Sequence, residues 1–120
     1  ESTGIDGVSL GGAVAMRVGL ARPEMFGAVG GIQPALRLDA SQEWTEIAKG
    51  ALAKRPKLKL RILTSTEDYF RPAVEQTSAA WQRAGIAHEM ATVVGPHDYP
   101  FNRGPGSVEL LMFHDRALRA

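Results

Sequence analysis

The chain has 120 residues, a length that fits one folded domain and excludes a multidomain organisation. It is 44% hydrophobic and 22% charged, which is typical of a globular protein and not of a disordered one. Its formal charge of +1 gives no basic footprint for nucleic acid and no polybasic anchor for a membrane. The chain contains no Cys, so disulfides, thiolate metal sites and a cysteine nucleophile are excluded.

The first half of the chain alternates between segments with strand and helix character. Residues 3–8 predict a short strand, and residues 11–21 predict a helix that is buried on most sides and ends at Pro23. The apolar, Gly-rich residues 26–32 favour a buried strand over a tight loop. After a loop, Ser41 is a candidate N-cap for a helix that ends before Pro56.

The same alternation continues to the end of the chain. Residues 57–65 give the clearest strand pattern, and the basic run that includes Arg61 is expected to form a solvated rim. Pro72 marks the first turn of a helix. Residues 86–94 predict a strand, which leads into a polar loop rich in Gly and Pro. Ser107 is expected to cap a final helix, whose buried face would carry Val108, Leu111, Met112 and Leu118.

The order of elements is β-α-β-α-β-α-β-α, which predicts an α/β protein with a parallel sheet of about four strands and helices on its faces. In such sheets the functional side chains gather outside the carboxyl ends of the strands. Ser9, the Ile32–Gln33 corner, the Thr66–Asp68 stretch and the loop after Val94 occupy those positions.

The pentapeptide Gly7-Val8-Ser9-Leu10-Gly11 satisfies the pattern G-x-S-x-G between a predicted strand and a predicted helix. A nucleophilic Ser in a sharp turn needs Gly two residues before and after it, because a Cβ on either residue would clash. The sequence therefore predicts a nucleophile elbow with Ser9 as nucleophile and Gly7 and Gly11 as its glycines. The alternative is a Gly-rich turn with an incidental Ser.

A Ser nucleophile needs a base, and His is the usual one. His97 lies just past the last predicted strand, whereas His88 and His114 lie within predicted elements, where a packed or solvent-facing imidazole is the simpler interpretation. The third member should be a carboxylate after an intermediate strand. Asp68 is the candidate, and Glu67 remains open as an alternative.

Glu75, or no acid at all, also remains open, and an acidic loop in solvent is the simplest alternative for the whole stretch. The order Ser, acid, His along the chain is that of the α/β-hydrolases. The sequence has no HExxH, G-x-G-x-x-G or Walker pattern, so neither a metal nor another cofactor is expected.

Three segments together resemble the esterase branch of the α/β-hydrolases, which includes esterase D-like, feruloyl and enterochelin esterases and the mycolyltransferases. The segments are GVSLGGAVAMRVGLARPEMFGAVGGIQPAL, TSTEDYFRPAVEQ and GPHDYPFNRG. The resemblance implies that Ser9 is the nucleophile, His97 the base and Asp68 the acid of a catalytic triad. It also implies that the backbone N–H of Leu10 is one oxyanion donor.

In that family the elbow lies near the middle of the fold, so residues 1–120 look like the carboxyl-terminal half of a catalytic domain, from the elbow strand to the last helix. The other half normally carries the second oxyanion donor, much of the substrate pocket and the strand that pairs with residues 3–8. We therefore expect a partner that covers this sheet edge, either a complementary amino-terminal half or a second copy of the chain.

The function predicted for the parent protein is that of a serine carboxylic-ester hydrolase. It would act on a small-molecule ester through an acyl-enzyme, and the isolated half would be impaired. The alternatives are an acyltransferase that uses the same triad, and a non-catalytic binding or assembly module that retains the fold.

Overall fold

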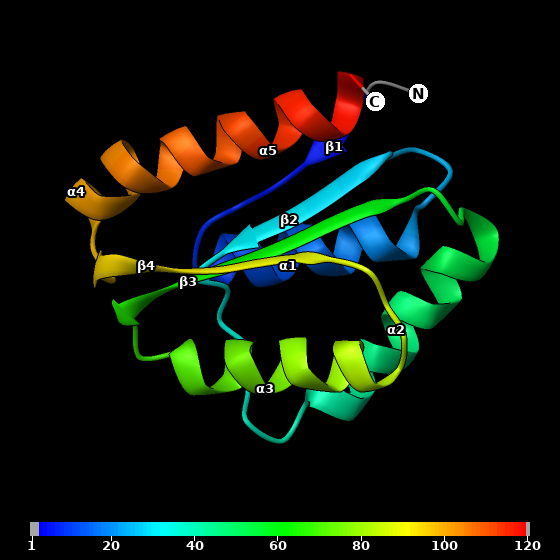
Figure 1. Cartoon of the computed structure of the whole chain (residues 1–120), viewed down its shortest axis with the longest axis horizontal. Coiled ribbons are helices and arrows are strands. Elements are labelled where there is room, and N and C mark those ends of the chain that lie inside the picture. Colours follow the sequence, from blue (N-terminus) through cyan, green and yellow to red (C-terminus); the bar gives the residue numbers. More distant parts are fainter. Residues whose placement is uncertain (1–2, 120) are drawn as a thin grey trace.

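A computed structural model describes residues 3–119 (Figure 1). The strands are β1 (Gly4–Ile5), β2 (Ala28–Ile32), β3 (Lys59–Glu67) and β4 (Glu89–Pro96). The main helices are α1 (Leu10–Ala21), α2 (Ser41–Lys54), α3 (Arg71–Arg83) and α5 (Ser107–Arg119). Between β4 and α5 lie one turn of helix, α4 (Tyr99–Phe101), and a π-helical segment, η1 (Asn102–Gly106).

The four strands form one parallel sheet in the order β1-β2-β3-β4, which confirms the predicted α/β architecture. The first strand is shorter than expected, because only Gly4 and Ile5 pair with β2, and Val8 makes an isolated bridge to Ile32. The ladder is interrupted at Asp6, whose carboxylate accepts a hydrogen bond from the N–H of Gly7 (2.8 Å).

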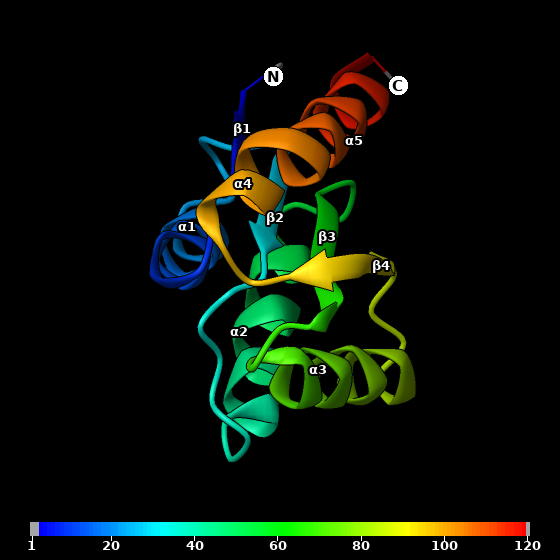
Figure 2. The same ribbon diagram turned by 90° about the vertical axis from the view of Figure 1, so that its left-hand side faces the viewer.

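Helices cover both faces of the sheet, with α1, α2 and α3 on one side and α5 on the other (Figures 1 and 2). The larger core cluster joins the three helices to the sheet and includes Met16, Ile62, Val74 and Trp81. A smaller cluster of Ile32, Leu63 and Phe101 lies on the other face. Parallel strands are usually buried on both faces, and β3 follows this rule from Leu60 to Ser65. Within residues 3–119 no helix is long and apolar enough to cross a membrane.

The burial predicted for two of the helices is wrong. The final helix packs on the sheet through Phe113 and not through the expected stripe, since Val108, Leu111 and Met112 are 54%, 67% and 50% exposed. The aromatic ring at position 113 fills the space above the sheet, and this turns the stripe outward. Helix α1 is also less enclosed than expected, because Leu10, Val14 and Val18 form an exposed line at spacing i, i+4, i+8.

Neither predicted Ser cap forms. Ala40 occupies the N-cap of α2, without a side-chain cap bond. Ser107 follows η1 without a break, so its hydroxyl donates backward to the carbonyl of Asn102 (2.7 Å). The end of α3 is as predicted, because Gly85 adopts φ 78° directly after it.

Arg61 is buried and does not lie on a solvated rim, which corrects the prediction for the basic run. Its side chain is 3% exposed and forms an ion pair with Asp6, which also accepts a hydrogen bond from His114 Nε2 (2.9 Å). A Cβ at Gly30 would lie 2.5 Å from the Asp6 carboxylate, so only Gly leaves room for this cluster. The cluster ties α5 to the sheet just before the turn that carries Ser9.

Candidate active site

Ser9 lies in a strained turn between β1 and α1. Its φ of 57° and ψ of −121° belong to the left-handed side of conformational space, which costs a non-Gly residue about 1–2 kcal/mol. Backbone bonds hold the turn, since Ser9 N donates to Ile32 O (2.9 Å) and Ser9 O accepts from Gly12, Ala13 and Ala35. The hydroxyl therefore stands at the carboxyl end of the sheet in a fixed position.

The two glycines of the pentapeptide differ in what they do. A Cβ at Gly7 would lie 2.3 Å from the carbonyl oxygen of Gly11, so this position requires Gly. A Cβ at Gly11 would meet nothing within 4 Å, so the prediction that Gly11 is sterically required is wrong. The turn instead brings the Gly11 carbonyl against Gly7, and a Cβ at Gly12 would lie 3.0 Å from Gly7 O and 3.2 Å from Pro34 Cα.

This difference gives a matched pair of variants. Gly7→Ala is expected to displace the turn and to slow fluorophosphonate labelling of Ser9 about 100-fold, since a shift of about 1 Å in a reacting group has that effect. Gly11→Ala is expected to keep the labelling rate and to raise the free energy of unfolding by up to about 1 kcal/mol, because Ala favours helix over Gly. Labelling kinetics and urea unfolding measure both. Equal labelling rates for Gly7→Ala and Gly11→Ala would contradict the conclusion that position 7, and not position 11, requires Gly.

His97 lies between Ser9 and Asp68 in one chain of hydrogen bonds. Its Nε2 is 2.9 Å from Ser9 Oγ, and its Nδ1 is 2.7 Å from Asp68 Oδ1. An ionised carboxylate only accepts hydrogen bonds, so Nδ1 carries the proton. In the neutral imidazole Nε2 is then free to accept the proton of the Ser9 hydroxyl. The three side chains predicted from the sequence are thus in direct contact.

The Asp68 carboxylate is buried and surrounded by donors. Besides His97, it accepts hydrogen bonds from Thr64 Oγ1 (2.6 Å) and from the N–H of Phe70 (3.1 Å). The two other candidate acids lie elsewhere: Glu67 is exposed, and Glu75 is exposed and pairs with an arginine on its own helix. Of the three acids considered, only Asp68 reaches the imidazole.

Aromatic rings fix the plane of the His97 imidazole. Tyr69 stacks on it with ring centroids 4.7 Å apart, and Phe70 meets it edge-on at 5.6 Å. Both residues directly follow the candidate acid in sequence. The segment after β3 therefore orients the imidazole by packing as well as by hydrogen bonding.

A cleft of about 500 Å³ opens beside Ser9 and His97. One wall comes from α4, η1 and the start of α5, through Tyr99, Asn102, Arg103 and Ser107. The backbone N–H of Leu10, at the first residue of α1, has no backbone acceptor among residues 3–119. It is therefore available to a ligand bound beside Ser9.

The helical turns after His97 were not predicted, because Gly and Pro dominate that segment. The signal was present in Asp98, whose Oδ1 accepts from the N–H of Phe101 (2.9 Å) as an N-cap. Pro100 in the first turn completes this start signal.

A second Ser–His contact lies away from the cleft. Ser78 Oγ is 2.7 Å from His88 Nε2, and His88 Nδ1 is 2.8 Å from the carbonyl oxygen of Ile86. This pair has a carbonyl where His97 has a carboxylate, and Ser78 is only 4% exposed. It therefore has neither the acid nor the access that the Ser9 site has.

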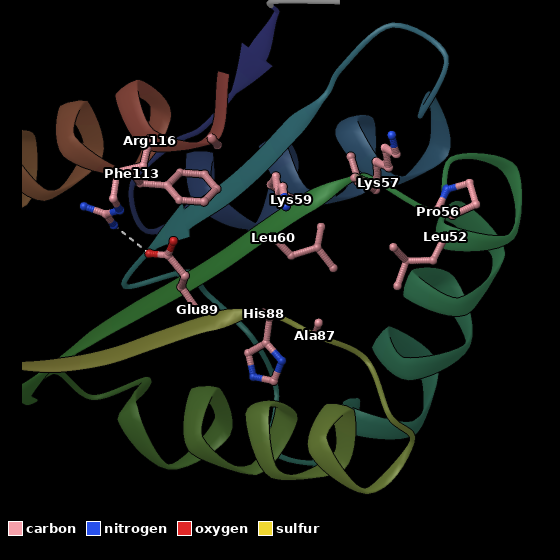
Figure 3. Close-up of a pocket in the computed structure, with 12 residues that line it drawn as sticks. Leu52, Pro56, Lys57, Lys59, Leu60, Ala87, His88, Glu89, Phe113 and Arg116 are labelled. Carbon is pink, nitrogen blue, oxygen red and sulfur yellow. Dashed lines mark hydrogen bonds and ion pairs between the residues drawn. The ribbon is translucent and has the colours of Figure 1, made fainter. Parts of the chain in front are cut away.

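His88 also lines a separate cavity of about 360 Å³ near the amino ends of β3 and β4 (Figure 3). Glu89 and Arg116 form an ion pair across it (2.7 Å), and Phe113 lies on the α5 side. Across the described residues, no group of three or more His, Asp or Glu side chains is arranged to hold a metal ion.

No protein-family model and no curated protein matches the sequence. Solved structures do match. An S-formylglutathione hydrolase of Staphylococcus aureus superposes with a TM-score of 0.73 at 16% identity, over 91% of this chain and 49% of that one. A ferulic acid esterase gives a TM-score of 0.77 at 17% identity, over 96% and 52%. A fluorophosphonate-binding serine hydrolase of S. aureus gives 0.75 at 13% identity, over 91% and 52%.

The chain thus spans about half the length of these structures. Its four parallel strands and flanking helices match theirs over nearly all of its own length. The chain has the α/β-hydrolase fold of these structures, over about half of their extent.

Proposed function

We propose that this chain carries the catalytic side chains of a serine carboxylic-ester hydrolase, with Ser9 as nucleophile, His97 as base and Asp68 as the acid that orients it. The observation that carries the proposal is the unbroken hydrogen-bond chain from Ser9 Oγ through His97 to Asp68, at the edge of an open cleft. The resemblance of the fold to a formylglutathione hydrolase and a ferulic acid esterase supports it.

In the proposed reaction, Ser9 Oγ attacks the ester carbonyl while its proton passes to His97 Nε2. The carbonyl oxygen becomes an oxyanion that accepts a hydrogen bond from the Leu10 N–H. The C–O bond to the alcohol then breaks, and His97 returns the proton to the leaving alcohol. Water attacks the acyl-enzyme by the same route, which releases the acid and restores Ser9.

We further propose that the functional protein includes a segment that completes the fold beside β1. The outer edge of β1 has no partner strand in residues 3–119, since β1 pairs only with β2. Exposed apolar side chains lie on the helices that cover the two faces: Leu10, Val14 and Val18 on α1, and Val108, Leu111 and Met112 on α5. Exposed apolar patches of this kind mark contact surfaces. The occupant that we propose is the part of the fold that the similar structures contain beyond their match to this chain.

The experiment compares the 120-residue chain with a longer form that includes flanking segments of its reading frame. We assay p-nitrophenyl acetate turnover and measure mass by light scattering. The chain alone is expected to be monomeric and about 10²–10³-fold slower, because it lacks one oxyanion donor. Val14→Lys should lower turnover of the longer form, while Lys49→Glu, at an exposed position of α2, should not. The proposal of a completing segment would be contradicted if the chain were fully active as a monomer, or if it dimerised through α1 and α5.

Added alcohols show whether the acyl group goes to water or to another acceptor. The hydrolase proposal expects the free acid as the main product in their presence. An ester of the added alcohol as the main product would instead identify an acyltransferase with the same site. A longer form that has no turnover and no fluorophosphonate labelling would reject the catalytic proposal altogether.

A further inference from the structure

Gln33 is the most completely bonded buried side chain near the candidate site that the proposed reaction does not use. It follows β2 directly, is 0% exposed, and has a left-handed φ of 47°. A non-Gly residue holds this conformation only where the surroundings enforce it. Its N–H donates to Leu63 O (2.6 Å), which anchors the strained backbone to β3.

The carboxamide of Gln33 reaches both sides of the loop that carries His97. Its Nε2 donates to the carbonyl oxygen of Pro96 (2.9 Å), the residue before His97, and to Ser65 Oγ (2.7 Å). Its Oε1 accepts from Asn102 Nδ2 (3.0 Å). Asn102 Nδ2 in turn donates to the carbonyl oxygen of Asp98 (3.0 Å), the residue after His97.

The orientation of both amides is fixed by these contacts. The carbonyl oxygens of Pro96 and Asp98 can only accept, so each must face an amide nitrogen. Gln33 then has both N–H groups and its oxygen satisfied within the protein. The two peptide carbonyls that flank His97 are held, directly or through Asn102, by this one side chain.

The backbone around Gln33 holds the nucleophile as well. Ile32 O accepts from Ser9 N (2.9 Å), and Ala35 N donates to Ser9 O (2.9 Å). Residues 32–35 therefore contact the turn of Ser9 through the main chain and the loop of His97 through the Gln33 side chain. No other short segment among residues 3–119 bonds to both.

We propose that Gln33 is a positioning residue for the reaction, which sets the distance between His97 Nε2 and Ser9 Oγ by fixing the loop of His97 against the turn of Ser9. The inference rests on the proposed function for its catalytic meaning, but the hydrogen-bond geometry that it assigns is independent of turnover. Gln33 touches no reacting atom, so it acts only through Pro96, Asn102 and the loop between them.

Two variants of similar shape test this role. Gln33→Met keeps the side-chain volume and removes all three hydrogen bonds. Gln33→Glu keeps the acceptor for Asn102 but loses both donors, and it turns an oxygen toward Pro96 O. Thr77→Val is the matched control, because Thr77 is also 0% exposed, lies on α3, and has a hydroxyl that finds no partner among residues 3–119. All are studied in the preparation in which the unchanged chain labels, after circular dichroism has confirmed that they fold.

Both Gln33 variants are expected to slow fluorophosphonate labelling of Ser9 about 10- to 100-fold, and the control less than twofold. In proton NMR, the low-field signal of the His97 Nδ1–H bonded to Asp68 should be present in the unchanged chain and in Thr77→Val. It should be shifted or broadened away in Gln33→Met. Retained labelling and a retained signal in folded Gln33→Met would overturn the proposal.

The two readouts separate the two claims. If the unchanged chain shows the low-field signal but never labels at Ser9, the proposed function fails, and loss of the signal in Gln33→Met still supports the positioning role. If the unchanged chain labels and both Gln33 variants label equally fast, the positioning role fails and the proposed function stands.

Discussion

Replacing Ser9 by Ala is expected to abolish fluorophosphonate labelling and to lower ester hydrolysis by about 10⁴-fold or more in any form of the protein that turns over. The reason is that His97 Nε2 lies 2.9 Å from this hydroxyl, and without the hydroxyl no acyl-enzyme can form. Initial rates with p-nitrophenyl acetate and labelling detected on a gel measure the effect. Stability should change little, because the side chain is small and lies at an open cleft.

Ser78→Ala is the control for this variant, because Ser78 is the other Ser with a His partner. Its hydroxyl is buried and its imidazole partner faces a carbonyl, so we expect rates within twofold of the unchanged protein. Loss of turnover in folded Ser78→Ala together with retention in Ser9→Ala would reverse the assignment of the two pairs.

Asp68→Ala is expected to lower turnover by about 10⁴-fold, the effect of losing the acid from a triad of this kind. The variant removes the acceptor that holds His97 Nδ1 and the charge that stabilises the imidazolium. It also leaves Thr64 Oγ1 and the Phe70 N–H without their partner, so unfolding in urea is measured alongside. Glu67→Ala is the control and should keep its rate, because Glu67 is exposed.

Asp68→Asn separates the charge of the acid from its geometry. The Phe70 N–H and the His97 Nδ1–H both point at Oδ1, so the amide oxygen should take that position and the NH₂ group should face Thr64 Oγ1. His97 would then keep its tautomer and lose only the negative charge beside it. We therefore expect a smaller loss than for Asp68→Ala. An equal or greater loss would mean that the amide turns its nitrogen toward His97.

The parts of the site that the sequence could predict are those set by local pattern. Ser9 is marked by its glycines, and Asp68 and His97 directly follow strands that the alternation of elements reveals. Parallel strands carry such residues to one edge of the sheet, so chain order and topology were sufficient to predict that these three lie close together.

The contacts that were missed join distant segments. The Ile32–Gln33 corner was expected at the functional edge of the sheet, but the proposed role of Gln33 arises from Pro96 and Asn102, more than sixty positions away. Arg61 belongs to a basic run in the sequence. It is buried with Asp6 because α5 packs over this part of the sheet. Nothing in the pattern around either residue records these partners.

The prediction of the buried face of α5 was wrong for a related reason. Two apolar sets compete on this helix, and periodicity alone favoured Leu111 and Met112 over Phe113. In residues 3–119 the larger Phe113 ring packs against the sheet, which leaves Leu111 and Met112 exposed. A complementary segment packed on that exposed set would satisfy both patterns of the sequence.

The most direct test is to locate the fluorophosphonate adduct by proteolysis and fragmentation mass spectrometry. If three distant side chains have been folded into one hydrolytic centre, a single adduct will be found and it will be on Ser9. An adduct on any other residue, or no adduct on Ser9 in a preparation that hydrolyses the ester, would contradict it.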